Sequence, residues 1–433
     1  MEKTDRNIQP PYKLVDNLNI SEPGRTALGN GIPLWLINSG TAGALRVEIL
    51  FETPFRHQKG PLVAPATNSM ITEGTSTRDS GEISGELEYY GAYLNQFANR
   101  DFAGLALYTL EKHLEPLLGI VSDVVRNPVF PGEELSVYLS NKKEEFAVNS
   151  KKVKFLAHRE FVKLLFGHSH PYGQLPEMND FDELDREELA ELHKSAYHAG
   201  NCKIIVAGGF DEDKTFGMLN RFFGDSEWSS NGEVKEDFPQ ASSSGCKKKF
   251  VPKPKNVQSA IRAGRPLFNK SNPLFPEMMV VNEVLGGYFG SRLMKNLREE
   301  KGYTYSVGSA LVSHKYGGYL TVATEVGSHV SDEALKEIHR ELSLLREEPV
   351  PGEELQLVKN FMMGELLRSF DGPFSIADSL RPVILHGEDF SFYKRTAAAI
   401  RDMTSVRLQE LAARFLKEED MCEVVAGKMK NPF

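Results

Sequence analysis

The sequence is poor in cysteine. Its 433 residues include three, Cys202, Cys246 and Cys422, which lie far apart and form no C-x-x-C pair. An odd and sparse count argues against a disulfide framework and fits a reducing compartment. Residues 1–19 are polar and mixed in charge, and they lack the apolar core of a secretory signal. We therefore expect a cytoplasmic protein, or a periplasmic one if a signal peptide has been removed.

Long hydrophobic runs and an excess of positive charge are also missing. No run approaches the roughly 18 consecutive apolar residues of a membrane-spanning helix, so we expect no membrane partner. The formal net charge is −9, which disfavours nucleic acid as a partner because phosphate binding depends on Lys and Arg. The remaining composition is ordinary for a globular protein, and 433 residues exceed what one core usually organises, so two domains are expected.

The chain repeats itself at long range. Pro-Gly-Glu-Glu-Leu stands at 131–135 and again at 351–355, an offset of 220 residues. Each copy follows a stretch with helical periodicity, at 114–126 and at 333–346. Each copy also predicts the start of another helix, with Pro in the first turn and acidic residues near the positive end of the helix dipole. The shared order of elements indicates a duplication.

Alternating apolar runs predict the strands. Two such runs joined by a polar or Gly turn occur at 93–107 and at 303–324, and each pair predicts a β-hairpin. Further strands are predicted at 45–51, 203–207, 259–263 and 423–426. We expect an α+β fold of two homologous domains, each an antiparallel-rich mixed sheet with helices packed on one face.

A connection separates the two halves. Ser, Gly, Pro and Lys gather between about 225 and 255, where the periodicity is lost, and such a composition marks an exposed loop. We predict an N-terminal domain at 1–228, a linker at 229–255 and a C-terminal domain at 256–433.

Three stretches carry a family resemblance. Residues 170–173 are His-Pro-Tyr-Gly, residues 202–211 are Cys-Lys-Ile-Ile-Val-Ala-Gly-Gly-Phe-Asp, and residues 297–306 are Leu-Arg-Glu-Glu-Lys-Gly-Tyr-Thr-Tyr-Ser. In this order they resemble the pitrilysin/insulinase family of zinc metallopeptidases, in its branch of two-domain, mitochondrial-processing-peptidase-like subunits. The resemblance covers nearly the whole chain. It implies a peptidase-like fold in both halves and peptides as the molecules on which the family acts.

The resemblance fails at the metal motif. Active members carry H-x-x-E-H on a helix, with two His ligands, a Glu base and a further Glu ligand downstream. Residues 70–75 resemble the stretch that follows this motif, so the motif positions hold Pro65, Asn68 and Ser69. Pro cannot bind a metal, and an Asn amide is no base at neutral pH. The downstream ligand is matched by Glu144 or Glu145, and a carboxylate alone does not hold zinc. We expect no metal in this chain.

Other His and Gly residues offer no substitute site. His168, His170, His193 and His198 lack the spacing of a complete ligand set, and we interpret them as surface or helix-end residues. The Gly-rich run at 286–291 lacks the Gly-Lys-Ser/Thr ending of a phosphate loop. We interpret it as a turn between helices that faces the peptide chamber.

Two residues of the second half match residues that the family uses in catalysis. Arg298 and Tyr305 stand seven residues apart, and the resemblance implies that they stabilise the charge that develops on the peptide carbonyl. The alternative is structural: Arg298 would pair with Glu299 or Glu300, and Tyr305 would pack on the sheet. We favour the catalytic interpretation, because both residues lie inside the most specific matching segment.

The resemblance also implies a peptide-binding strand. Family members bind substrate as an added strand along a sheet edge of the first domain. The matching residues here are Leu94, Asn95, Gln96 and Phe97. An ordinary sheet strand is the alternative.

We therefore expect a catalytically incomplete subunit without a cofactor of its own. It would form a heterodimer with a zinc-bearing paralogous subunit and lend it Arg298, Tyr305 and half of the chamber that holds unfolded peptides for proteolysis. In isolation a homodimer is the alternative assembly. Two other functions stay open: a non-proteolytic structural or assembly subunit, and a self-sufficient enzyme with a different site.

Overall fold

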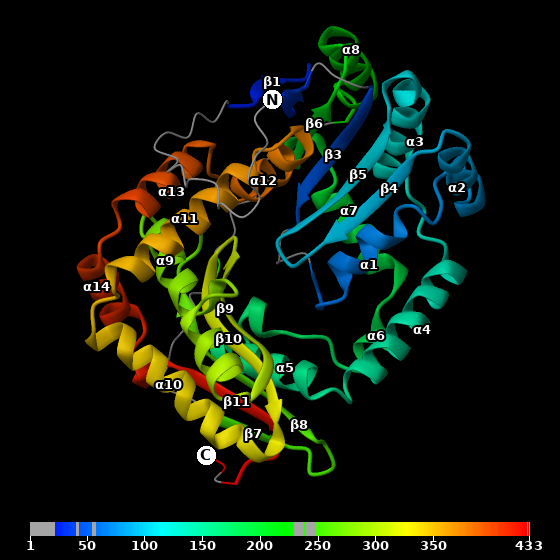
Figure 1. The fold of residues 1–433 in the computed structure, drawn as a ribbon. Coiled ribbons are helices and arrows are strands. Elements are labelled where there is room, and N and C mark those ends of the chain that lie inside the picture. The colour runs from blue at the N-terminus through cyan, green and yellow to red at the C-terminus, as the bar shows by residue number, and fades with distance from the viewer. Residues whose placement is uncertain are drawn as a thin grey trace, which may run out of the picture.

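The computed structural model describes residues 22–39, 43–53, 58–228, 238, 248–430 and 432. The predicted linker at 229–255 lies outside these residues, except for 238 and 248–255. Figure 1 shows two sheets, one from each half of the chain, with helices arranged around them. Within the described ranges, no helix combines the length and the apolar character that crossing a membrane requires.

The first half forms a six-stranded sheet in the order β1-β2-β6-β3-β5-β4. Its strands are β1 (Gly24–Ala27), β2 (Pro33–Asn38), β3 (Ala44–Glu52), β4 (Tyr93–Ala98), β5 (Phe102–Leu110) and β6 (Cys202–Gly208). β2 and β6 are parallel and all other neighbours are antiparallel. The predicted hairpin is confirmed as β4–β5, and it places β4 at the edge of the sheet.

The second half forms a five-stranded sheet in the order β7-β11-β8-β10-β9. Its strands are β7 (Lys248–Pro252), β8 (Gln258–Leu267), β9 (Thr304–His314), β10 (Gly317–Gly327) and β11 (Cys422–Gly427). Their order and sense repeat those of β2-β6-β3-β5-β4, with one parallel pair at one end and a hairpin at the other.

The corresponding strands β6 and β11 end in the same unusual backbone conformation. Gly208 has a φ of +139° and Gly427 a φ of +141°, a region that favours glycine. A Cβ atom at either position would lie 2.3 Å from a neighbouring oxygen atom. The duplication indicated by the repeated Pro-Gly-Glu-Glu-Leu is therefore confirmed at the level of backbone geometry.

The helices follow the predicted pattern. Those of the first half are α1 (Val63–Met70), α2 (Ser80–Tyr89), α3 (Leu114–Arg126), α4 (Gly132–Asn149), α5 (Val153–Phe166), α6 (Asp180–Glu183), α7 (Arg186–Ala196) and α8 (Glu212–Phe223). Those of the second are α9 (Phe275–Asn282), α10 (Ser331–Glu347), α11 (Gly352–Arg368), α12 (Pro373–Leu385), α13 (Ser391–Asp402) and α14 (Ser405–Phe415). Pro131 and Pro351 directly precede α4 and α11, one residue earlier than predicted.

One helix of each half covers the sheet of the other half. α5 packs on β8 and β11, and α12 packs on β2 and β6. The two apolar contacts are large; they include Phe161, Phe166, Tyr319 and Val424 around α5, and Trp35, Ile205, Leu380 and Val383 around α12. Separating the halves would expose both apolar faces. Burial of each such side chain stabilises the fold by roughly 1.5–3 kcal/mol, so the separation would be costly.

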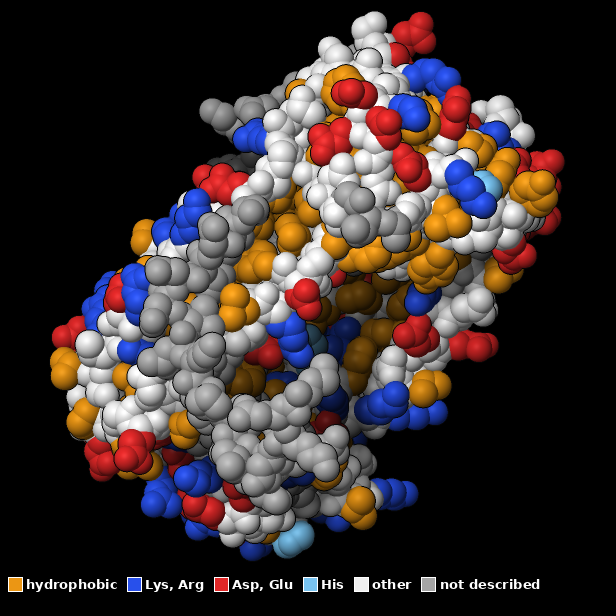
Figure 2. All heavy atoms as spheres, turned by 45° about the horizontal axis from the view of Figure 1, so that its top comes forward, with side chains coloured by type: hydrophobic (Ala, Val, Ile, Leu, Met, Phe, Trp, Pro, Cys, Tyr) orange, Lys and Arg blue, Asp and Glu red, His pale blue; other side chains and the backbone are white. Residues whose placement is uncertain are grey.

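The surface is hollowed between the two halves. Figure 2 shows hydrophobic and basic side chains inside this hollow. In Figure 1, α1 and β4 lie on the side of the first half that is turned toward the second. The degenerate motif on α1 and the predicted peptide-binding strand β4 therefore lie on this inner side.

Candidate functional site

The degenerate motif at 65–69 lies on α1. This helix begins at Val63, so Pro65 stands in its first turn, where a backbone N–H would have no partner within the helix. Pro65 thus costs the helix no hydrogen bond, and it faces a cavity together with Asn68 and Ser69. The replacement of both His positions is compatible with a well-formed helix.

Asn68, at the position of the catalytic base, holds the sheet edge to α1. Its amide nitrogen donates to the carbonyl oxygens of Phe97 at 3.0 Å and Gly104 at 3.1 Å, and its oxygen accepts from the Tyr197 hydroxyl at 2.9 Å. The side chain is buried. The three hydrogen bonds join α1 to three different parts of the fold, namely β4, β5 and the residue that follows α7. Asn68 therefore has a structural role that sequence reasoning missed.

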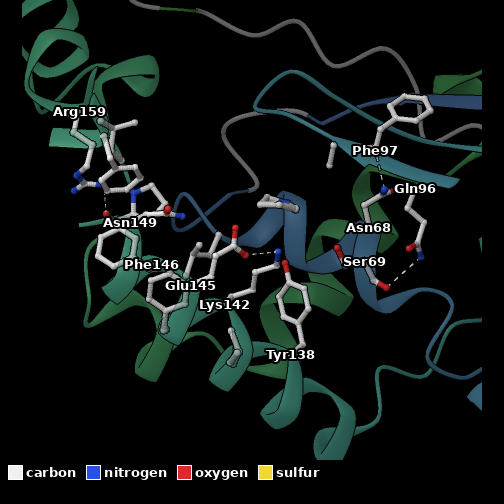
Figure 3. A pocket seen from close by; sticks show the side chains of 18 of the residues that line it. Asn68, Ser69, Gln96, Phe97, Tyr138, Lys142, Glu145, Phe146, Asn149 and Arg159 are labelled. Carbon is white, nitrogen blue, oxygen red and sulfur yellow. Dashed lines mark hydrogen bonds and ion pairs between the residues drawn. The ribbon is translucent and has the colours of Figure 1, made fainter. Parts of the chain in front are cut away.

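A cavity of about 430 Å³ lies beside this motif, between α1, the end of β4, α4 and α5 (Figure 3). Ser69 and Tyr138 of α4 both line it, and burial raises the pKa of the Tyr138 hydroxyl. Glu145 lines the cavity, and Lys142 pairs with it at 3.0 Å. Glu144 is exposed and does not line it. Of the two predicted residual ligands, Glu145 is thus the one that faces the motif.

The donor set at this position does not fit zinc. Pro65 has no donor, Asn68 is engaged in three hydrogen bonds, and Ser69 offers only a hydroxyl. Glu145 contributes a carboxylate, which is paired with Lys142. Among the residues that the structure describes, no group of three or more His, Cys, Asp or Glu side chains is arranged to hold a metal. Zinc needs a complete and oriented set of ligands.

The histidines occupy helix ends. His170 and His198 directly precede short 3₁₀ turns, and His193 lies in the last turn of α7, where its Nε2 is 2.8 Å from the Val125 carbonyl oxygen. His168 is exposed. The prediction of surface or helix-end residues is confirmed, although His170 and His198 are buried. Burial lowers the pKa of His193 and of His198, so both rings are neutral at pH 7.

Arg298 and Tyr305 lie side by side in the second half. The guanidinium carbon of Arg298 is 4.7 Å from the centroid of the Tyr305 ring and 4.8 Å from that of Phe289. Tyr305 is 83% exposed and Phe289 62% exposed. In the described part of the chain, the guanidinium and the phenol hydroxyl have no hydrogen-bond or ion-pair partner. The predicted structural alternative, an ion pair of Arg298 with a neighbouring Glu, is not formed.

The chain brings these two residues together by a turn between a π-helix and an edge strand. Arg298 lies in the π-helix η6 (Met294–Glu300), and Tyr305 lies at the start of β9. Gly302 connects them with a φ of +64°, which glycine adopts without strain. π-helical turns are rare and often occur at functional sites. No sequence signal distinguished η6 from an α-helix.

The Gly-rich run before η6 packs tightly against the second sheet. A second π-helix, η5 (Glu283–Gly287), ends at this run. A Cβ atom at Gly286 would lie 2.6 Å from the backbone nitrogen of Ser309 on β9. The glycine thus permits a close approach of the turn to the sheet, as a connection between helices requires.

The predicted peptide-binding strand is β4. Gln96 and Phe97 line the cavity beside α1, whereas Leu94 packs against the core and Asn95 is exposed. Gln96 donates to the Ser69 carbonyl oxygen at 3.2 Å. The ring of Phe97 lies on the opposite face, against Arg381 of α12. Figure 3 shows the Gln96 side chain directed toward Ser69 and the Phe97 ring directed away from it.

The two groups of predicted site residues do not share a cavity. The residues that surround the cavity beside α1 include neither Arg298 nor Tyr305. The degenerate motif and the Arg–Tyr pair thus lie at separate places on a peptidase-like scaffold.

Comparisons with known proteins agree with a peptidase-like scaffold. The profile of the insulinase family, peptidase family M16, matches residues 63–164, and the profile of the peptidase M16 inactive domain matches residues 183–362. An uncharacterised zinc protease of Bacillus subtilis is 24% identical over 399 residues, with 90% of this chain and 95% of that protein covered. The mitochondrial-processing peptidase subunit beta of Caenorhabditis elegans is 22% identical, with 93% of this chain and 89% of that protein covered.

Solved structures show the same fold. The crystal structure of a peptidase M16 inactive domain from Pseudomonas fluorescens superposes with a TM-score of 0.87 at 21% identity and covers 96% of this chain and 100% of that one. A chain of complex III from Candida albicans superposes with a TM-score of 0.73 at 15% identity, with 93% of this chain and 95% of that one covered. The chain described here belongs to the insulinase family, peptidase family M16.

Proposed function

We propose that this chain is the zinc-less subunit of a two-subunit peptidase, and that it contributes Arg298 and Tyr305 to the site of a zinc-bearing partner. One observation carries the proposal: the two side chains lie together, with Tyr305 exposed and Arg298 half-buried, and no acidic side chain in the described residues engages them. A surface Arg–Tyr pair without a structural partner is available to another molecule.

The chemistry of the pair suits peptide hydrolysis. When water attacks a peptide carbonyl, negative charge develops on its oxygen, and a donor aimed at that oxygen lowers the barrier by about 2.7–4 kcal/mol. The Tyr305 hydroxyl can donate to this oxygen. The guanidinium of Arg298, fixed between two aromatic rings, can bind a neighbouring peptide carbonyl. The partner would bind and activate the attacking water, because residues 65–69 include neither metal ligands nor a general base.

The partner would be a paralogous chain with an intact H-x-x-E-H motif, and unfolded peptides would be the substrate. Relatives named as zinc proteases support this class of partner. Cys202 is a buried free thiol, which supports a reducing compartment such as the cytoplasm.

The test is a matched pair of Tyr variants. The tagged chain is purified from its native cell with whatever protein accompanies it, and peptidase activity is measured on an unfolded peptide. Tyr305→Phe should lower kcat about 10²–10³-fold without loss of the complex. Tyr89→Phe, at a residue that is 82% exposed in the first half, should leave kcat unchanged. Equal rates for the two variants would refute the role of Tyr305.

A second function is favoured by the engagement of Asn68. A motif residue that has become a structural bridge between α1, β4 and β5 suits a chain that serves only in assembly. In that case the purified complex would be stable, and no combination with its partner would hydrolyse peptides.

A further inference from the structure

The duplication gives the second half a cavity of its own. This cavity has a volume of about 830 Å³ and lies between α9, α11, α12 and α13 (Figure 1). Most of the positions of α4 and α5 that line the cavity beside α1 recur, 220 residues later, among the residues that line this second cavity. Glu145 and Phe146 correspond in this way to Glu365 and Leu366. The two cavities therefore occupy the same place in the two halves.

The lysine that neutralises a carboxylate of the first cavity has no counterpart in the second. In the first half, Lys142 pairs with Glu145 at 3.0 Å. The corresponding residues of the second half are Met362 and Glu365, and both line the cavity. The second half has thus kept the carboxylate, and an apolar side chain stands in the place of its cation.

Two of the three carboxyl groups that line the second cavity have a cation of their own. Glu365 pairs with Arg368 at 2.5 Å, and Asp378 pairs with Arg46 at 3.0 Å. The third is Glu283, at the start of η5. Within the described residues, its carboxyl group has no hydrogen-bond or ion-pair partner. One carboxyl group is thus left to interact with a molecule in the cavity.

The cavity combines this carboxyl group with apolar walls. Burial, and then the charge of Glu365, raises the pKa of Glu283 to about 7. The ionised form of Glu283 is therefore poorly compensated in the free chain, and a cation that enters the cavity would compensate it. The apolar side chains around the cavity are Met279, Phe361, Met362, Leu366 and Ile400. They would bury the carbon chain of a ligand that carries such a cation.

Helices and the turns beside them form the whole described wall of this cavity. None of the described residues that line it lies on a strand of the second sheet. An extended peptide would therefore find no sheet edge there with which its backbone could pair. The volume of about 830 Å³ falls within the roughly 300–1,000 Å³ of pockets that bind small molecules. The cavity thus suits a small molecule better than a peptide.

We propose that the cavity of the second half binds a small primary amine, whose ammonium group lies against Glu283 and whose apolar chain lies against Met279, Met362 and Leu366. The ligand class is that of short aliphatic amines. The inference is independent of the proposed function, because it needs neither a partner subunit nor the hydrolysis of a peptide.

Isothermal titration calorimetry of the full chain at pH 7 tests the site with hexylamine and 1-hexanol, which differ in charge and hardly in shape. Hexylamine should bind at least about tenfold more tightly, because its ammonium group meets a carboxylate. The ammonium group also lowers the pKa of Glu283, so binding should release up to about half a proton into the buffer. This release appears as a difference between the heats in phosphate and in HEPES. Equal affinities for the amine and the alcohol would overturn the proposal.

Two pairs of variants locate the binding. Glu283→Gln should weaken the binding of hexylamine at least about tenfold, abolish the proton release and leave the binding of hexanol unchanged, whereas Glu353→Gln, on the exposed surface of α11, should change none of these. Met362→Lys provides the cation that Lys142 supplies in the first half, and it should abolish amine binding. Leu357→Lys, at a residue of α11 that is 63% exposed, should keep it. Full amine affinity in a folded Glu283→Gln variant, or equal losses in the two Lys variants, would refute the site.

A lysine side chain of a peptide carries the same ammonium group, so a second probe separates the two sources. N-acetyl-lysine N-methylamide has a peptide group on each side of the lysine. It should bind at least about fivefold more weakly than hexylamine, because the helices around the cavity offer these groups no sheet edge. Affinity equal to that of hexylamine would assign the cavity to a peptide side chain and overturn the proposal of a small amine.

Discussion

Replacing Asn68 by Asp tests how the former base position now holds the fold. The two side chains have nearly the same shape, but a carboxylate cannot donate, so the carbonyl oxygens of Phe97 and Gly104 lose their common donor. Phe97 and Gly104 keep each other as partners in the β4–β5 ladder, so each lost hydrogen bond costs about 0.5–1.5 kcal/mol, and a buried carboxylate that faces two carbonyl oxygens adds a further penalty. The Tyr197 hydroxyl can still donate to Asp, so that contact is kept. The expected destabilisation is about 2–5 kcal/mol, concentrated at the edge strand β4.

Hydrogen–deuterium exchange measures this effect locally, because a chain with two sheets need not unfold in one step. Peptides that cover 93–98 should exchange much faster in Asn68→Asp, while those that cover β11 should change little. Asn141→Asp makes the same chemical change on the exposed surface of α4 and should stay within about 0.5 kcal/mol of the wild type. If the amides of residues 93–98 exchange at the same rate in both variants, Asn68 does not hold β4 to α1.

Two other predictions concern the second half. Burial, and then the charge of Glu365, raises the pKa of Glu283 to about 7. The stability that this group contributes is fully present below its unfolded pKa and is lost as the pH rises through 7. The substitution Glu283→Gln should therefore raise the melting temperature relative to wild type more at pH 8 than at pH 5. An equal difference at both pH values would contradict this assignment. Phe289→Ala removes one of the two rings that hold Arg298, a contact worth about 0.5–1 kcal/mol at an exposed site, and kcat/KM of the mixture with the partner should fall about two- to fivefold. An unchanged kcat/KM would mean that Tyr305 alone positions the guanidinium.

Much of the fold could be predicted because its signals are local. Period-two runs located both hairpins, helical periodicity located α3 and α10, and the repeated Pro-Gly-Glu-Glu-Leu revealed the duplication. The exchange of α5 and α12 between the halves could not be predicted. An apolar helix face shows that a helix is buried, but its sequence does not say which sheet buries it.

The candidate site divides in the same way. Motif register was enough to place Pro65 and Ser69 on a helix and Arg298 near Tyr305. It could not decide between Glu144 and Glu145, because adjacent helical residues point about 100° apart and only the packing of α4 fixes which one faces α1. The part played by Asn68 was equally hidden, since its partners Phe97, Gly104 and Tyr197 are distant in sequence.

The central claim is that hydrolysis requires a metal and a base from a second polypeptide. It is tested most directly by measuring bound zinc and peptidase activity in the purified chain after equilibration with zinc, and again after a zinc-bearing partner is added. We expect no bound zinc and no hydrolysis for the chain by itself, and about one zinc per pair with hydrolysis in the mixture. One tightly bound zinc in the isolated chain, together with peptide hydrolysis, would contradict the account.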